Sequence, residues 1–218
     1  MSRSLLLLAT LGLLLSTALA AKATGSGPRC SPSGSVTVAE SSEARVYRKR
    51  KSSTVNFACW KRTGRTKQLD EPDREIIYFG RPAISLAGSV LVSGAIEVLE
   101  AIDTEPHTFV FVEDLRASLG GGRGVPSDGF AVDLSGVGTI AAKPNGSFAY
   151  IECPISAVDE PCFGGREEPF KVYRVTASRQ PKPKRLDRSR GIEPSSLTVS
   201  GSRLSWTKYG KRYSASLR

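Results

Sequence analysis

The feature that most constrains the fold of this chain is an alternation of short apolar runs with small polar or glycine breaks, clearest over residues 191–217. Runs of β-branched and aromatic residues bounded by glycine and serine predict β-strands. Three such runs occur there, at 197–199, 203–207 and 213–217. No part of the sequence carries a sustained helical period, so we predict an all-β protein of short antiparallel strands.

The same pattern recurs upstream at intervals of roughly fifty residues, which predicts a repeated β unit. Segments with two apolar runs around a small break lie at 36–47, 84–93, 132–142 and 197–206. Each is followed by a later strand that begins near an aromatic residue, and these residues are Phe57, Phe109, Phe170 and Tyr213.

One such unit cannot bury both faces of its sheet, whereas stacked neighbours can. We therefore predict that residues 36–218 form a single all-β domain of about four imperfect, blade-like repeats, as in a small or partial β-propeller. A β-sandwich is the alternative, because it also gives short strands at regular spacing. The apolar alternation of Tyr213, Ala215 and Leu217 continues to the last residues, so the final strand is expected to pair with the first repeat.

The first twenty residues have the features of a secretory signal peptide. Arg3 provides a positive charge, residues 5–15 form an apolar run, and Ala18-Leu19-Ala20 fits a small-x-small cleavage site. We expect residues 1–20 to be removed, which makes the mature chain secreted or extracytoplasmic. An uncleaved membrane anchor is the alternative, although the apolar run is short for a span.

The mature chain is expected to contain no transmembrane span. The uncharged run 82–96 is too short and is interrupted by Gly88 and Gly94, so a buried hairpin fits it better. Residues 21–35 are rich in glycine, serine and proline and are expected to form an irregular lead-in. Asn145-Gly146 predicts a hairpin turn, because both residue types tolerate positive φ.

The cysteines Cys30, Cys59, Cys153 and Cys162 form an even set in an exported chain, which predicts disulfide bonds. Four cysteines allow three pairings, and proximity in sequence favours Cys30–Cys59 and Cys153–Cys162. The first pair would clamp the lead-in onto the strand that contains Cys59. No metal site is expected, because there is no CxxC spacing and only one histidine.

The formal net charge is +10, and clusters of such charge attract polyanions through long-range attraction and counterion release. For an exported protein the expected partners are anionic extracellular or envelope polymers, and no specific nucleic acid is predicted. An aromatic neighbour can stack on a base or a sugar. The candidate contacts are Arg45, Arg48, Lys49, Arg50, Lys51, Trp60, Lys61, Arg62, Arg65, Lys182, Lys184 and Arg185. The alternative is that these residues only solvate outward strand positions.

Common catalytic patterns are absent from the sequence. His107 is the single histidine, and its surroundings indicate a turn before a strand rather than a catalytic triad. Residues 136–141 match a loose dinucleotide fingerprint, but a turn follows them in place of the required helix, so no cofactor is expected.

We therefore expect a disulfide-stapled, non-catalytic β protein. The alternative is a secreted hydrolase that uses loop carboxylates, with at least two of them in one pocket. The candidates are Asp70, Asp73, Glu75, Asp103, Glu113, Asp114, Asp159 and Glu160.

Two stretches resemble a known group of proteins. Cys-Trp-Lys-Arg-Thr-Gly-Arg at 59–65 follows an Ala-Arg-Val-Tyr strand at 44–47, and residues 196–206 read Ser-Leu-x-Val-Ser-Gly-x-x-Leu-Ser-Trp. Together they resemble small exported proteins of high-GC actinobacteria, over most of the mature chain. The layout also resembles β-propeller repeats, without their Trp-Asp blade ending. The resemblance implies an exported β protein and brings no activity, substrate or catalytic residue with it.

Overall fold

The computed structural model describes residues 30–51, 55–69, 76–99, 107–120, 130–132, 135–154, 162, 169–178 and 182–218. The predicted signal peptide and most of the lead-in lie outside these residues.

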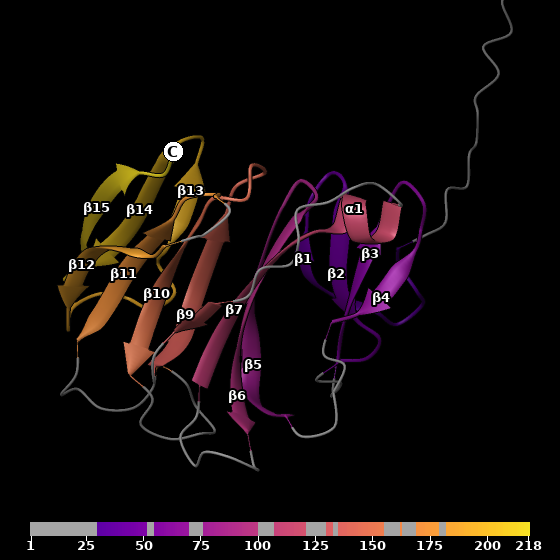
Figure 1. The fold of residues 1–218 in the computed structure, drawn as a ribbon, viewed down its shortest axis with the longest axis horizontal. Coiled ribbons are helices and arrows are strands. Elements are labelled where there is room, and N and C mark those ends of the chain that lie inside the picture. Colours follow the sequence, from indigo (N-terminus) through magenta and orange to yellow (C-terminus); the bar gives the residue numbers. More distant parts are fainter. Residues whose placement is uncertain are drawn as a thin grey trace, which may run out of the picture.

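Four antiparallel sheets make up the fold, and they follow one another along the chain (Figure 1). Sheet A contains β1 (Val36–Glu40), β2 (Ala44–Arg48), β3 (Asn56–Trp60) and β4 (Thr66–Gln68). Sheet B contains β5 (Ile76–Ala87), β6 (Val90–Leu99), β7 (His107–Asp114) and β8 (Phe130–Val132). Sheet C contains β9 (Ser135–Ala142), β10 (Phe148–Pro154), β11 (Phe170–Val175) and β12 (Lys184–Ser189). Sheet D contains β13 (Thr198–Ser200), β14 (Arg203–Lys208) and β15 (Lys211–Ser216).

The prediction of an all-β fold of antiparallel sheets is confirmed. One short helix, α1 (Leu115–Gly120), occurs among the described residues and was not predicted. Residues 82–96 lie in the hairpin of β5 and β6, as expected. His107 is the first residue of β7 rather than part of a preceding turn. Residues 184–189 form the edge strand β12.

The aromatic markers of the repeat lie at equivalent places in the four sheets. Phe57, Phe109, Phe170 and Tyr213 belong to β3, β7, β11 and β15, which are the third strands of their sheets. Three of the four matched segments, 36–47, 84–93 and 197–206, span the first hairpin of sheets A, B and D.

The fourth matched segment, 132–142, was aligned incorrectly. β9 runs without a break through Gly136 and Gly138, and the first hairpin of sheet C turns at the predicted Asn145-Gly146, where Gly146 has φ of +84°. Gly138 serves close packing instead, because an added Cβ would lie 3.0 Å from the Sγ atom of Cys162 and 3.3 Å from the Cβ atom of Pro194.

Successive sheets bury their faces against one another. On β10, Phe148 and Tyr150 point into a core shared with Val92 of sheet B. The alternate residues, Ala149 and Ile151, point into a second core on the side of sheet D. Because side chains alternate along a strand, β10 is buried on both faces. A third apolar core lies between sheet A and sheet B.

The outer face of sheet A is covered by the start of the described chain. Cys30, Tyr47 and Cys59 form a small buried cluster there, and the ring of Phe57 stacks on Tyr47 with centroids 5.7 Å apart. The disulfide Cys30–Cys59 joins the lead-in to β3, and Cys153–Cys162 forms the second bond, so both predicted pairings are confirmed.

The predicted pairing of the last strand with the first repeat is wrong within the described residues. β15 is hydrogen-bonded to β14, and sheet A lies at the other end of the row of sheets (Figure 1). The reason is the order of the stacked sheets: sheets B and C lie between sheet D and sheet A, so β15 shares no ladder with sheet A.

Replacing both Cys30 and Cys59 with serine is expected to lower the free energy of unfolding by about 3–4 kcal/mol in the loop-entropy model. The cysteines are 29 residues apart. The matched control is the Cys153→Ser/Cys162→Ser variant, whose cysteines are 9 residues apart and whose loss is expected to be smaller, about 2–3 kcal/mol. Denaturant unfolding measures both, and a larger loss in the control variant would contradict this account.

Candidate functional site

Sheet D has two chemically different faces. Its two tight hairpins keep the three strands in register, so the alternating residue types of each strand fall on the same two faces. At the β14–β15 turn, Tyr209 and Gly210 have φ of 50° and 68°. Positive φ at both central residues is typical of a type I′ turn, whose twist matches that of the strands it joins. Gly201, with φ of 57°, starts the two-residue turn between β13 and β14. These turns fix the register, so alternate residues of all three strands share a face.

The inward face of sheet D is apolar. Leu204, Trp206 and Leu217 are at most 5% exposed and pack against sheet C. The ring of Trp206 stacks on that of its cross-strand partner Tyr213, with centroids 6.2 Å apart. This face holds the sheet in place.

The outward face of sheet D carries hydroxyl and guanidinium groups and no carboxylate. Cross-strand partners bring these side chains together in rows on the face opposite the apolar one. The residues of this polar face are Thr198, Ser200, Arg203, Ser205, Thr207, Arg212, Ser214 and Ser216. Six of the eight are exposed, whereas Ser205 is buried in the central strand and Thr207 is half-buried. The arrangement presents many hydrogen-bond donors to solvent.

One carboxylate holds sheet D to the edge of sheet C. Asp187 of β12 accepts a hydrogen bond from Nε1 of Trp206 at 3.0 Å and binds the Nζ atom of Lys208 at 2.9 Å. The same Nζ atom lies 4.5 Å from the ring centroid of Tyr213. Burial raises the pKa of Asp187, but hydrogen bonds from Lys208 and Trp206 outweigh it, so the pKa lies below the ordinary 3.8. The hydrogen bond to Asp187 in turn raises the pKa of Lys208.

An aromatic ring stands at the tip of the β14–β15 hairpin. Tyr209 is 71% exposed, and its ring lies over Gly191, where an added Cβ would meet the ring at 2.3 Å. The backbone N–H of Tyr209 also donates to the carbonyl of Gly191 at 2.9 Å. Glycine at this position therefore allows an exposed tyrosine to be held in one place beside the cationic strands.

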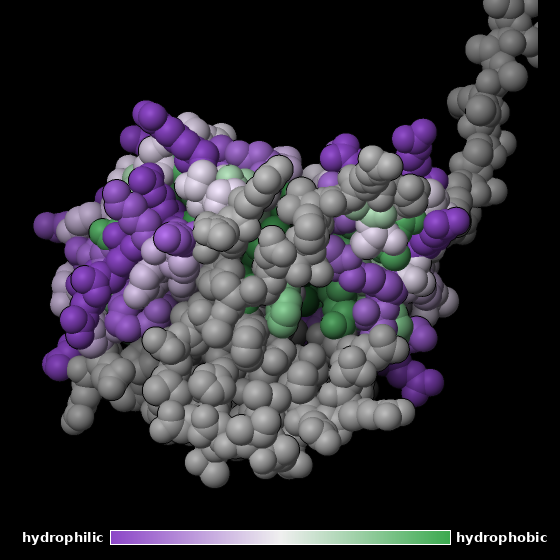
Figure 2. Space-filling model, viewed as in Figure 1, coloured by the Kyte–Doolittle hydropathy of each residue, from purple (hydrophilic) through white to green (hydrophobic). Residues whose placement is uncertain are grey.

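The region around sheet D is strongly basic. Residues 182–218 contain ten Lys and Arg residues and two acidic ones, Asp187 and Glu193, so they supply most of the net charge of +10. Figure 2 shows hydrophilic side chains gathered at this end of the molecule, over sheets C and D. Asp187 is already paired, so the exposed cations dominate the local field.

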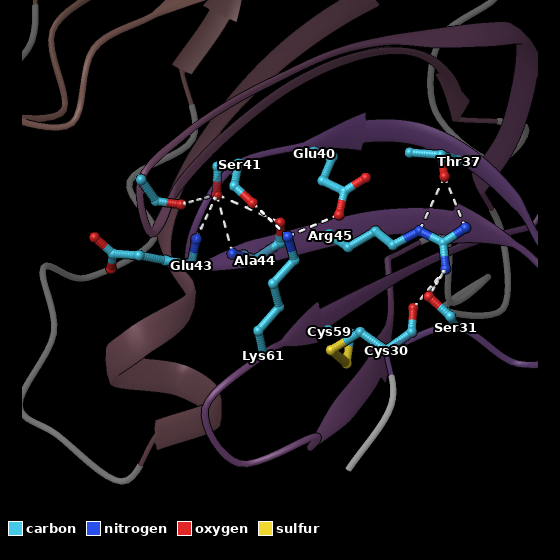
Figure 3. Close-up of polar contacts among 11 residues, drawn as sticks. Cys30, Ser31, Thr37, Glu40, Ser41, Glu43, Ala44, Arg45, Cys59 and Lys61 are labelled. Carbon is cyan, nitrogen blue, oxygen red and sulfur yellow. Dashed lines mark hydrogen bonds and ion pairs between the residues drawn. A yellow bond between two sulfur atoms is a disulfide. The ribbon is translucent and has the colours of Figure 1, made fainter. Parts of the chain in front are cut away.

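The amino-terminal basic cluster behaves differently, because part of it is structural. Arg45 is 7% exposed and donates to Oγ1 of Thr37, the carbonyl of Cys30 and Oγ of Ser31 (Figure 3). It ties β1 to the segment fixed by the first disulfide. Trp60 is 5% exposed and packs between sheets A and B. Arg45 and Trp60 therefore expose little surface to a polyanion.

Other cations of this cluster are also engaged. Lys61 binds Glu40 at 2.7 Å and the carbonyl of Ser41 at 2.6 Å (Figure 3). Arg48 donates to the side chain of Asn56, and Lys49 lies 4.5 Å from the ring centroid of Phe57. The predicted contacts that remain exposed on sheet A are Lys49, Arg50, Lys51, Arg62 and Arg65.

The structure does not bring the predicted basic residues onto one surface. Those of sheet A lie at the opposite end of the row of sheets from sheet D (Figure 1). Of the predicted contacts near β12, Lys182, Lys184 and Arg185 are exposed. In the ladder between β11 and β12, Lys184 is opposite Arg174 and Arg185 is opposite Tyr173. Because neighbouring residues of a strand point to opposite faces, Lys184 and Arg185 lie on different faces of sheet C.

The carboxylates proposed for a hydrolase do not converge where the structure describes them. Glu113 is ion-paired with Lys67, and Asp114 caps α1 through the backbone N–H of Arg116. These neighbours in β7 point to opposite faces. The other candidates, Asp70, Asp73, Glu75, Asp103, Asp159 and Glu160, lie outside the described residues. Within the described part of the chain, no three potential metal ligands cluster, and no helix has the length and apolarity of a membrane span.

Sequence reasoning missed the polar face, although the signal was present. Residues 198–200, 203–207 and 212–216 alternate between Ser, Thr or Arg and apolar residues, and Lys208 and Lys211 stand on either side of the second turn. Cations spaced along strands do not form a continuous basic run in the sequence, so they are not recognised as a cluster. Those of sheet D are Arg203, Lys208, Lys211 and Arg212. Reading the period-two pattern across both hairpins would have placed Arg203 and Arg212 on the same face.

No family model, no curated protein and no solved structure matches the chain.

Replacing Asp187 with asparagine is expected to lower the free energy of unfolding near neutral pH by about 1.5–3 kcal/mol, the scale of a hydrogen bond to a charged group. Because the folded-state pKa of Asp187 is depressed, its contribution is complete above the ordinary 3.8 and is lost as pH falls through the folded-state value. The stability difference between wild type and variant should therefore shrink below about pH 4. Denaturant unfolding at a series of pH values measures it.

Glu193→Gln is the matched control, because it removes the same charge from an exposed residue of the neighbouring turn. Its effect on stability should stay within about 0.5 kcal/mol. A difference for Asp187→Asn that is constant with pH would contradict the role assigned to the charge.

Proposed function

We propose that this chain is an exported, disulfide-stapled, non-catalytic β protein that binds anionic extracellular or envelope polymers through the polar face of sheet D. The observation that carries the proposal is the composition of that face, which has six hydroxyl side chains and two arginines and no acid. The two disulfides and the leader-like first twenty residues support an extracytoplasmic location.

The chemistry of the polar face suits phosphate or sulfate groups repeated along a chain. Arginine donates to such oxyanions through two parallel N–H groups, and serine and threonine hydroxyls donate from shorter reach. Arg203 and Arg212 lie four residue positions apart along the face, because Arg203 is opposite Ser216 and Arg212 is opposite Thr207. A polymer that lies along the strands can therefore contact both arginines through separate anionic groups. The exposed ring of Tyr209, at the hairpin tip near Arg212, offers a surface on which a sugar or base can stack.

The proposal includes the blade-like character of the sheets. Two features support it: the aromatic marker in each third strand and the burial of sheet C on both faces. In such a row the end sheet has one face without a neighbour, and that face is available for a ligand. No described carboxylate pair supports the hydrolase alternative.

The test compares two variants that remove the same charge from opposite ends of the molecule. Arg203→Gln/Arg212→Gln changes the polar face, and Arg62→Gln/Arg65→Gln changes exposed arginines of sheet A. Binding of inorganic polyphosphate, dextran sulfate and polygalacturonate is measured by calorimetry at several salt concentrations. The first variant is expected to bind phosphate or sulfate polymers about tenfold more weakly, or worse, with a shallower salt dependence.

The sheet A variant should change the affinity by less than about threefold, since its arginines lie outside the proposed face. Equal weakening in both variants would show general ion exchange and would overturn the proposal. Tighter binding of polygalacturonate than of the other two polymers would redirect it to carboxylate-bearing chains.

A further inference from the structure

The outer edge of β15 carries backbone groups that no described residue satisfies. In a two-residue hairpin the closing pair, Lys208 and Lys211, exchanges hydrogen bonds, and every second pair after it does the same. The residues between these pairs, Arg212, Ser214 and Ser216, therefore turn their N–H and C=O groups away from β14. The carbonyl of Ser216 accepts from Nη1 of Arg174 at 2.7 Å, which agrees with this outward direction. Arg212 and Ser214 are left with open backbone donors and acceptors.

This edge differs from the other sheet edges that the structure describes. Proteins protect edge strands by keeping them short, by bulges or by charge, because an open edge recruits another strand. β4, β8 and β13 have three residues each. The pairings of β1, β5, β9 and β12 with their neighbours each contain a register shift. β15 has six residues and pairs with β14 without a shift.

We propose that the β15 edge is a docking site for an acidic, extended segment of a partner protein, which would add a fourth strand to sheet D. The occupant is identified by charge. The side chains of Lys211 and Arg212 lie next to the open backbone groups of Arg212 and Ser214. The surrounding residues 182–218 are strongly basic. A second copy of this chain would bring like charges together at the same edge, whereas an acidic strand would be attracted to it.

The register of β15 specifies the partner sequence. An antiparallel strand would place successive residues opposite Ser214, Tyr213, Arg212 and Lys211. Tyr213 is 38% exposed on the inward face, so an apolar residue opposite it would gain contact with its ring. Acidic residues opposite Arg212 and Lys211 would pair with those cations. The expected core is therefore Thr-Val-Glu-Glu. This proposal does not depend on polymer binding by the polar face.

The experiment uses an eight-residue capped peptide, Ser-Thr-Thr-Val-Glu-Glu-Thr-Ser, and the full mature chain. The variant Ser214→Pro removes the outward N–H of the edge, at a kind of position where proline is tolerated in strands. Ser214→Ala is the matched control, because it loses the same hydroxyl and keeps the N–H. Peptide binding, measured by fluorescence anisotropy, should be about tenfold weaker or worse in Ser214→Pro than in Ser214→Ala.

Two measurements on the unmodified protein guard against misfolding of the proline variant. Binding should be lost for a peptide N-methylated at the amides that face β15. The amide protons of Arg212 and Ser214 should exchange fast in the free protein and slow down when the peptide is added.

The outcomes separate the possible occupants. Equal binding of the N-methylated peptide, or no change in exchange at Arg212 and Ser214, would overturn the strand-docking proposal even if polymers bind. Protection of these amides that rises with protein concentration, without peptide, would assign the edge to a second copy. If the unmodified protein binds the peptide but does not bind polyphosphate, only the function proposed for the polar face is contradicted.

Discussion

The structure depends on one constraint: a small antiparallel sheet with an apolar face cannot shield that face from water by itself. Sheets B and C meet this constraint by stacking, and β10 shows it most clearly. Its residues Phe148 and Tyr150 are buried on one side, and Ala149 and Ile151 are buried on the other. A row of stacked sheets has two end faces, however, and the chain treats them in opposite ways. The outer face of sheet A is covered by the segment at Cys30, which packs on Tyr47 and Cys59 of that sheet, whereas the outer face of sheet D stays open and is made of Ser, Thr and Arg.

The two end sheets differ in the role of charged side chains, with a buried contact at sheet A and solvent-exposed groups at sheet D. At sheet A, the guanidinium of Arg45 is buried, and its donors are satisfied by Thr37, Ser31 and the carbonyl of Cys30. A buried cation without such partners would be costly, so these contacts stabilise the covering segment. At sheet D, the main charged contact, between Asp187 and Lys208, lies under the sheet and leaves the arginines of the polar face without an acidic neighbour on that face.

Much of the architecture could be predicted from the sequence, because alternation and turn chemistry are local signals. The aromatic residues of the third strands, the Asn145-Gly146 turn and both disulfides follow from spacing and residue type alone. The errors concern tertiary contacts. The segment 132–142 was matched to the hairpins of the other sheets, but it is one unbroken strand in which Gly138 makes room for Cys162 and Pro194. Arg45 was interpreted as a surface cation, because a sequence does not show which cation a disulfide-linked segment will cover. The polar face was missed for another reason: its period-two signal is local, but its two cations are single residues on separate strands and form no run in the sequence.

Both surfaces assigned to sheet D rest on the same rigid support. The apolar face of the sheet is packed against sheet C, and Asp187 fixes Trp206 and Lys208 of the central strand β14 from below. Strands held in this way position side chains more firmly than loops do, and less conformational entropy is lost when a ligand binds. The cations at the edge of β15 have a second effect, because Lys211 and Arg212 repel another copy of the same strand while they attract acid. An open edge can therefore persist in a basic protein of this kind without self-association, and the charge that protects it also selects what can bind to it.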